Sequence, residues 1–135
     1  MRVFLTKWMA RYARREGISN ESLSEAIARA EMGLIDADLG GGLIKQRIAR
    51  AGKGRSGGYR TIVAYRRAEK AFIIYGFAKS ERGNLGRGEL KTAREIAAIW
   101  IPADERRISA GLEAGELEEV DYGQEKDQQI RGGAS

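Results

Sequence analysis

The sequence predicts an α+β fold in which two helices precede a small antiparallel sheet and further helices follow it. Three observations predict this class. Apolar residues first recur at three- and four-residue steps, then alternate with polar residues over short segments, and finally return to helical spacing. Hairpin-sized links separate the alternating segments, which favours antiparallel pairing. We therefore expect the order α-α-β-β-β-α-α, with a sheet of three to four strands.

Two helices are expected before the sheet. Apolar residues recur at helical spacing in the first segment, and Gly17 is a natural stop for that helix. These apolar residues are Phe4, Leu5, Trp8, Met9, Tyr12 and Ala13. Ser19 is a suitable N-cap for a second helix, which ends at Gly33.

Three strands are expected between residues 43 and 78. Residues 43–49 alternate between a polar and an apolar face, as a strand with one solvated side does. Residues 59–67 continue the alternation and place Tyr59 and Arg60 on opposite faces. Residues 71–78 are almost entirely apolar, which is typical of a central strand covered on both faces.

The segments on either side of these strands are less regular. Residues 34–42 are expected to form a turn that leads into the sheet rather than a metal loop. Asp36 and Asp38 lack the spacing of an EF-hand, and no third ligand is evident. Helical spacing returns from residue 87 to Trp100, and Pro102 interrupts it. A short helix is expected over residues 103–112, and the pattern decays from Gly115 onward. The expected domains are 1–101 for the main domain, 102–122 for a C-terminal helical extension and 123–135 for a flexible tail.

The composition excludes several kinds of chemistry. The 135 residues include no cysteine and no histidine, so disulfides, thiolate metal sites and histidine bases are absent. Any catalysis must rely on Lys, Arg, Tyr, hydroxyl, carboxyl or backbone groups, and we expect no metal or cofactor. No apolar run approaches the roughly 20 residues of a membrane span, and the first residues lack the long apolar region of a signal peptide. The cytoplasm is the expected location.

Positive charge is concentrated in the middle of the chain. Residues 43–94 contain 14 Lys and Arg against three acidic residues, with tyrosines among them. A basic sheet with aromatic rings suits nucleic acid, because cations replace the counterions of phosphates and rings stack on unpaired bases. Residues 101–135 instead carry four basic and nine acidic residues. That acidic segment is either an ordinary solvated surface or a shield for the basic one.

A glycine-rich stretch, Lys53-Gly-Arg-Ser-Gly-Gly-Tyr-Arg, lies between the first two expected strands. It lacks the Gly-Lys-Ser/Thr ending of a P-loop, although its glycines permit close approach to a phosphate. Lys45 and Arg47 precede it, and Lys79 and Arg82 follow it. We expect these cations to converge on one surface of the sheet. The large apolar residues are instead expected in the core: Trp8, Phe72, Ile74 and Trp100.

Three segments resemble those of a known family: Gly42-Leu-Ile-Lys-Gln-Arg-Ile, Gly54-Arg-Ser-Gly-Gly-Tyr-Arg-Thr-Ile and Ile74-Tyr-Gly-Phe-Ala-Lys-Ser-Glu-Arg. With two helices before a small sheet, the sequence resembles the RelE/ParE superfamily of toxin–antitoxin toxins. It is most similar to the HigB-like toxins of the RelE branch. The resemblance covers roughly residues 1–100 and implies a RelE-like α+β fold.

The resemblance implies a bacterial ribosome-dependent endoribonuclease, an mRNA interferase that inhibits translation by cutting mRNA in the decoding site. Active sites in this family use Lys, Arg and Tyr, which agrees with the absence of histidine here. By position, Arg60 would bind the scissile phosphate or the oxyanion of a pentacovalent intermediate, and Lys79 and Arg82 would stabilise charge in the transition state. Lys53 and Arg55 would lie across the cleft, where a lysine of lowered pKa takes the 2′-hydroxyl proton.

The residues expected to bind RNA are Lys45, Arg47, Tyr59 and Tyr65. Tyr59 suits a core position equally well. Some RelE relatives place a tyrosine in the final segment, whereas no tyrosine follows Lys79 here until Tyr122. The identity of the general acid and base therefore stays open.

Two other functions are compatible with the sequence. One is ParE-like inhibition of DNA gyrase, although that branch generally lacks such a dense set of cations. The other is non-catalytic binding of RNA or DNA. For the endoribonuclease, the expected partners are the ribosome, mRNA and a neutralising antitoxin, a small helix-turn-helix DNA-binding protein, with no membrane partner. The acidic residues 113–121 are a further candidate contact for the antitoxin.

Overall fold

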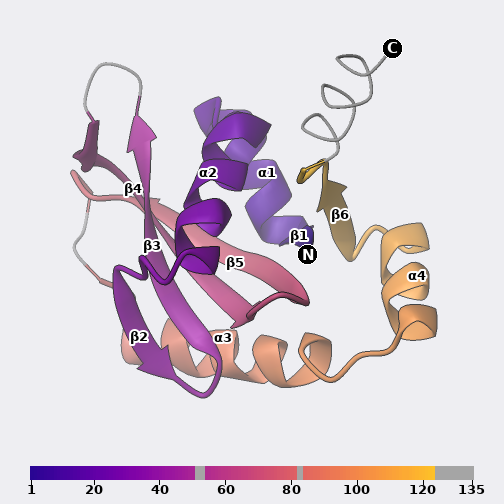
Figure 1. The fold of residues 1–135 in the computed structure, drawn as a ribbon. Coiled ribbons are helices and arrows are strands. Elements are labelled where there is room, and N and C mark those ends of the chain that lie inside the picture. The colour runs from indigo at the N-terminus through magenta and orange to yellow at the C-terminus, as the bar shows by residue number, and fades with distance from the viewer. Residues whose placement is uncertain (51–53, 82–83, 124–135) are drawn as a thin grey trace, which may run out of the picture.

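The computed structural model describes residues 1–50, 54–81 and 84–123, without the side chains of residues 50 and 54–57. The fold is an α+β arrangement with helices on both faces of one sheet (Figure 1). The elements in chain order are β1 (Arg2–Thr6), α1 (Lys7–Glu16), α2 (Asn20–Glu31), β2 (Ala37–Gly40), β3 (Leu43–Arg50), β4 (Gly54–Arg66), β5 (Lys70–Ala78), α3 (Arg87–Trp100), α4 (Glu105–Glu113) and β6 (Leu117–Val120).

The described strands form a six-stranded mixed sheet in the order β2-β3-β4-β5-β1-β6. The β3–β4–β5 meander is antiparallel, as the sequence predicts, and its two hairpin links connect neighbouring strands. The expected sheet was too small and wrong in being purely antiparallel, because β1 pairs with β5 in parallel. Strand β5 therefore has a partner on each side and is buried along most of its length, in agreement with its apolar sequence.

The first six residues are a correction to the expected helix. Val3, Phe4 and Leu5 form a consecutive apolar run that fits a central strand as well as a helical stripe, and all three are buried in β1. The helix begins only at Lys7. Thr6 marks the boundary: its Oγ1 accepts a hydrogen bond from the Met9 amide at 3.1 Å and donates one to the Ile74 carbonyl at 2.8 Å.

Two short strands were not expected. Strand β2 lies in the segment predicted as a turn, and strand β6 lies after Gly115, where the sequence predicts no regular element. Each has four residues, which is too short for alternation to be distinguished from an irregular segment. In β6, Leu117 and Val120 are buried while Glu118 and Glu119 are exposed, and the strand pairs with β1.

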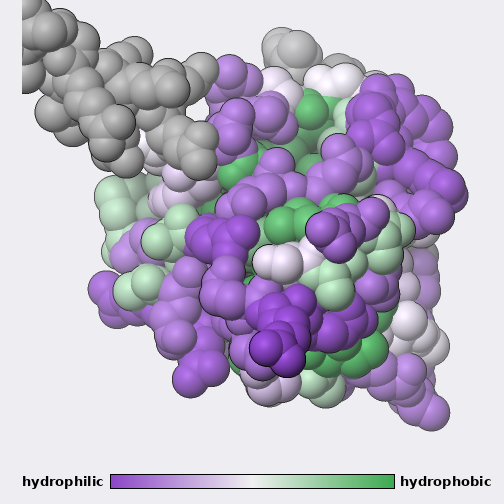
Figure 2. Space-filling view, turned by 90° about the vertical axis from the view of Figure 1, so that its right-hand side faces the viewer, coloured by the Kyte–Doolittle hydropathy of each residue, from purple (hydrophilic) through white to green (hydrophobic). Residues whose placement is uncertain are grey.

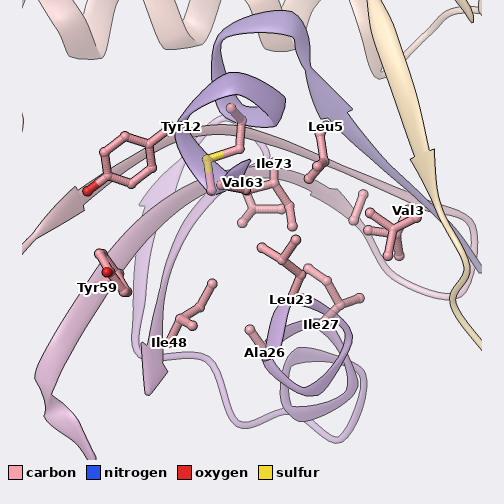
Figure 3. Close-up of a cluster of buried hydrophobic side chains, with 14 of the residues drawn as sticks. Val3, Leu5, Tyr12, Leu23, Ala26, Ile27, Ile48, Tyr59, Val63 and Ile73 are labelled. Carbon is pink, nitrogen blue, oxygen red and sulfur yellow. The ribbon is translucent and has the colours of Figure 1, made fainter. Parts of the chain in front are cut away.

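The sheet separates two apolar cores. Helices α1 and α2 cover one face; Figure 3 shows Leu23 and Ile27 of α2 close to Val63 and Ile73 of the sheet. The second core lies on the face covered by α3. It contains Phe4, Trp100, Ile108 of α4 and Leu117 of β6, so residues from the expected helical extension share a core with the main domain.

Helix boundaries follow the caps that the sequence contains. Ser19 caps α2 by accepting the Ser22 amide, and Asp104 caps α4 by accepting the Arg107 amide. Gly17 ends α1 with a φ of 70°, a left-handed conformation that glycine adopts without strain. These ends orient α1 and α2 across the sheet face opposite α3.

Candidate functional site

The cations of β3 and β4 lie on one face of the sheet. Arg47 is directly opposite Arg60 in the β3–β4 pairing, and Lys45 is opposite Ile62. Since residues alternate along a strand, these side chains share the α3 face of the sheet with the apolar residues Leu43, Ile62 and Phe77. The apolar core under α3 therefore gives way to a charged surface, which we call the cationic face: Lys45, Arg47, Arg60 and Lys79.

Arg60 is the buried member of the cationic face. Only 7% of its surface is exposed, whereas Arg47 opposite it is exposed. Burial and the neighbouring Arg47 guanidinium lower the pKa of Arg60 below the ordinary arginine value, although arginine remains charged at any physiological pH. Two cations on adjacent strand positions repel each other, and an anion between them relieves that repulsion. A phosphate is one anion whose charge suits this pair.

The backbone of Arg47 is fixed at the edge of the sheet by an ion pair. The β2 pairing of β3 ends at Lys45, so among the described residues no strand lies beside Arg47 on the outer edge of β3. Asp36 Oδ2 accepts the Arg47 amide at 2.7 Å, and Arg29 Nη2 donates to the Arg47 carbonyl. Arg29 and Asp36 are themselves joined at 3.2 Å. Together they replace a neighbouring strand and hold Arg47 in register with Arg60.

Arg29 is anchored by a third group. Its Nε donates to Glu25 one helical turn earlier at 2.9 Å, and its side chain is only 8% exposed. Gln46 supports the same corner: its Oε1 accepts the Asp36 amide, and its Nε2 donates to the carbonyls of Ala26 and Leu34. The edge of β3 is thus bound to α2 and to the segment before β2, so Arg47 has a rigid support.

The two lysines of the cationic face are exposed or half-buried. Lys45 Nζ donates to Asn84 Oδ1 at 2.7 Å, just before Gly86 caps α3. The Lys79 amide donates to the Gly58 carbonyl at 3.1 Å, which continues the β4–β5 pairing by one residue. Strand alternation then places Lys79 on the face of Phe77 and Arg60.

The two tyrosines expected to bind RNA lie on the opposite face. Tyr59 is 3% exposed, packs edge-on against Tyr12 and donates its hydroxyl to Glu16 at 3.2 Å. The Tyr65 hydroxyl donates to Glu31 at 2.6 Å, and burial raises the pKa of Tyr65. Tyr59 is therefore a core residue, and the structure does not bring either ring to the cationic face.

Tyr75 lies on the side of the cationic face, although it was not among the residues expected to bind RNA. If the β4–β5 hairpin kept the register that it has next to the 67–70 turn, Tyr75 would pair with Thr61. The Tyr75 side chain would then lie on the face covered by α1. The pairing shifts by one residue between Ile62 and Val63, so Tyr75 lies opposite Ile62 instead. Such a bulge moves every residue beyond it to the other face. No sequence signal marks its position.

Three of the expected catalytic residues cannot be placed. Lys53 and Arg82 lie outside the described residues, as does the side chain of Arg55, whose backbone belongs to β4. Asp36 and Asp38 do not form a metal loop: Asp36 binds Arg29 and the Arg47 amide, and Asp38 accepts the Gly40 amide at 2.8 Å. Within residues 1–50, 54–81 and 84–123, no cluster of three carboxylates suited to a metal ion is found.

The fold and the motifs now agree with a family comparison. A model described as the RelE toxin of the RelE / RelB toxin–antitoxin system matches residues 1–120. The chain belongs to the RelE toxin family. It is thus a toxin of a toxin–antitoxin system, and family membership implies a cognate antitoxin. A search of curated proteins found no match to the chain.

The family match extends beyond the segment in which the sequence showed the resemblance. It includes α4 and β6, which pack against the same core as α3 and β1. In the described part of this RelE-family toxin, no helix is long and apolar enough to cross a membrane. Residues 124–135, most of the expected flexible tail, lie outside the described residues.

The acidic C-terminal residues of this toxin pair with arginines away from the cationic face. Glu119 binds Arg2 at 2.8 Å, and Glu118 binds Arg14 at 2.8 Å. Glu105 of α4 also binds Arg2, at 2.7 Å. Figure 2, viewed toward the β6 side, shows a mainly hydrophilic surface interrupted by apolar patches. In the described residues, these carboxylates therefore fasten β6 and α4 to β1 and α1.

Proposed function

We propose that this toxin is an endoribonuclease that cuts mRNA on the ribosome and so stops translation. The observation that carries the proposal is the buried Arg60 directly opposite the exposed Arg47. RelE-family toxins are generally endoribonucleases, and a pair of cations supported by the sheet suits the phosphate at which the cut is made.

The chemistry needs neither a metal nor histidine. The 2′-oxygen attacks the adjacent phosphorus after losing its proton, the bond to the 5′-oxygen breaks, and the leaving oxygen takes up a proton. The products are a 2′,3′-cyclic phosphate and a 5′-hydroxyl end. Negative charge develops on the non-bridging oxygens during this step, and preorganised cations stabilise it.

Each described cation has a role set by its position. Arg60, held by the sheet, binds the non-bridging oxygens of the scissile phosphate. Arg47 and Lys79 add positive charge from either side, and Lys45 holds the neighbouring phosphate of the RNA. Lys53, Arg55 and Arg82 retain the roles that the family resemblance implies, with a lysine as the group that takes the 2′-hydroxyl proton.

The partners follow from this activity. The ribosome presents mRNA to the cationic face in the cytoplasm, and a DNA-binding antitoxin of the helix-turn-helix class neutralises the toxin. We place the chain in the HigB-like part of the family on the three sequence segments that suggested it.

Growth arrest tests the assignment in cells. Induction of the wild-type toxin should stop growth, and incorporation of labelled amino acids should fall before incorporation of labelled thymidine. Arg60→Ala and Arg47→Ala should relieve the arrest by at least tenfold in survival. Arg106→Ala, which removes an exposed arginine of α4 far from the cationic face, is the matched control and should remain toxic.

Two results would contradict this function. Early loss of thymidine incorporation would point to a gyrase inhibitor, and full toxicity of a folded Arg60→Ala protein would remove the assigned role of Arg60. Because Arg60 is buried, circular dichroism should confirm that this variant folds. Arg47→Ala changes an exposed side chain and provides the test with little risk to folding.

A further inference from the structure

Trp8 is a large aromatic residue on the surface rather than in the core where the sequence placed it. It lies in the first turn of α1 and is 44% exposed. One ring neighbour is Tyr12, stacked at a centroid distance of 5.1 Å and an angle of 14°. The other is Tyr75, in an edge contact at 5.2 Å and 89°. The indole is thus held in a fixed orientation while much of its surface remains open to solvent.

Tyr75 connects this exposed ring to the cationic face. It lies opposite Ile62, one alternation along the same sheet face from Phe77, which is opposite Arg60. The parallel partner β1 pairs with β5 only as far as Ile73, so Tyr75 is beyond the last paired position of that edge. Burial, with a smaller contribution from Glu89, raises the pKa of Tyr75, so the phenol is neutral at physiological pH.

Exposed cations also lie beside the indole on its own helix. Lys7 and Arg11 are exposed on either side of Trp8 in α1, and Arg11 lies one helical turn after it. Arg15 continues the row, with its guanidinium 5.2 Å from the centre of the Tyr12 ring. An apolar protein partner would have to desolvate these cations, whereas a nucleic acid supplies phosphates for them and a base for the ring.

We propose that Trp8, supported by Tyr12 and Tyr75, is a stacking site for an unpaired nucleobase of the RNA whose phosphates lie on the cationic face. Trp8 belongs to α1, which covers the sheet face opposite the cationic face, and it reaches the cationic side through its contact with Tyr75 at the edge of β5 beyond the last β1 pairing. A single strand that passes around this edge meets the phosphate site on β4 and then the base site on α1. The inference rests on the proposed function only in assuming that RNA occupies the cationic face.

Tryptophan fluorescence reports on this site directly. The chain has two tryptophans, and Trp100 is 5% exposed and packed against Phe72, so a base that stacks on the protein surface would quench mainly Trp8. The probe is a short single-stranded oligonucleotide with 2′-O-methyl groups, which prevent attack by the 2′-oxygen. Inorganic polyphosphate is the control ligand because it offers phosphates without bases. Anisotropy of the labelled oligonucleotide measures its binding independently.

The expected result is quenching by the oligonucleotide and none by polyphosphate. Trp8→Ala should weaken oligonucleotide binding by about 5- to 150-fold, which corresponds to the roughly 1–3 kcal/mol of one base–aromatic stack. Its affinity for polyphosphate should be unchanged. Trp8→Phe keeps a ring on Tyr12 and should restore most of the binding. Ile99→Ala, which removes another exposed apolar side chain, is the matched control and should bind as the wild type does.

Failure of this inference can be distinguished from failure of the proposed function. Oligonucleotide binding without quenching, or equal binding by Trp8→Ala, would overturn the stacking site while leaving cleavage by the cationic face intact. Absence of oligonucleotide binding to the wild type at low salt would overturn it as well. Conversely, quenching that depends on Trp8 in a protein that never cuts mRNA would support the site and refute the endoribonuclease.

Discussion

The ion pair at the β3 edge gives the most quantitative prediction, for Asp36→Ala. This change removes the acceptor of the Arg47 amide at 2.7 Å and of Arg29 Nη1 at 3.2 Å. A hydrogen bond to a charged group contributes about 1.5–3 kcal/mol, and breaking a fully buried ion pair costs about 3–5 kcal/mol. The Asp36 side chain is 25% exposed, and in the variant Arg29 keeps its contacts with Glu25 and the Arg47 carbonyl. The loss of stability should therefore lie in the range for a hydrogen bond to a charged group rather than in that for a buried ion pair.

We therefore expect Asp36→Ala to lower the free energy of unfolding by about 2 kcal/mol, equivalent to a fall in Tm of about 5–8 °C for a domain of this size. Asp38→Ala is the matched control, because Asp38 is exposed and, among the described residues, accepts only the Gly40 amide. It should cost less than about 1 kcal/mol. Urea denaturation and thermal melts of both variants measure the difference.

The same change tests whether the ion pair positions Arg47 for the reaction. In Asp36→Ala the rate of mRNA cleavage at saturating ribosomes should fall more than the apparent affinity for ribosomes does. Asp36→Asn keeps an acceptor for the Arg47 amide and should recover most of that rate while remaining less stable than the wild type. Equal stability of Asp36→Ala and Asp38→Ala, with equal cleavage rates, would show that Asp36 neither stabilises the β3 edge nor positions Arg47.

Further predictions concern packing and titration. The Tyr12 hydroxyl is buried with no hydrogen-bond partner in the described residues, so Tyr12→Phe should raise stability by up to about 1 kcal/mol in urea denaturation. Burial raises the pKa of Tyr12 from 10.0 to about 12. The stability that depends on a neutral Tyr12 phenol is therefore fully present below pH 10 and is lost as the pH rises toward 12. Tyr12→Phe removes the titrating group and should reduce this loss of Tm at alkaline pH. Gly111→Ala should destabilise by about 1–3 kcal/mol, because its Cβ would lie 2.6 Å from Trp100. Gly88→Ala, with nothing within 4 Å, should be neutral or stabilise α3 by up to about 1 kcal/mol, and an equal loss in both variants would contradict the packing described.

Local patterns predicted the central part of the fold. The alternation in residues 43–49 and 59–67 and the apolar run of residues 71–78 identified β3, β4 and β5, and the caps at Ser19 and Gly17 marked the helix ends. The first strand could not be recognised, because Val3, Phe4 and Leu5 satisfy either period. Its parallel pairing with β5 joins segments about 70 residues apart, and no local pattern encodes such a contact.

Local patterns likewise predicted only part of the candidate site. Lys45, Arg47 and Arg60 were expected together because a period of two fixes their face once the strands pair. Tyr75 was missed because its side depends on a bulge, and the role of Asp36 was missed because it depends on an open edge of β3. Both features arise from tertiary pairing, which determines register beyond what one strand can show.

Primer extension on a defined mRNA in a purified translation system tests directly whether this toxin cuts mRNA on the ribosome. Wild-type toxin, Arg60→Ala and Arg106→Ala would be compared with and without ribosomes. We expect cuts only when ribosomes are present, made by the wild type and Arg106→Ala and lost in Arg60→Ala. Unimpaired protein synthesis without cuts, or equal cutting by a folded Arg60→Ala protein, would contradict it.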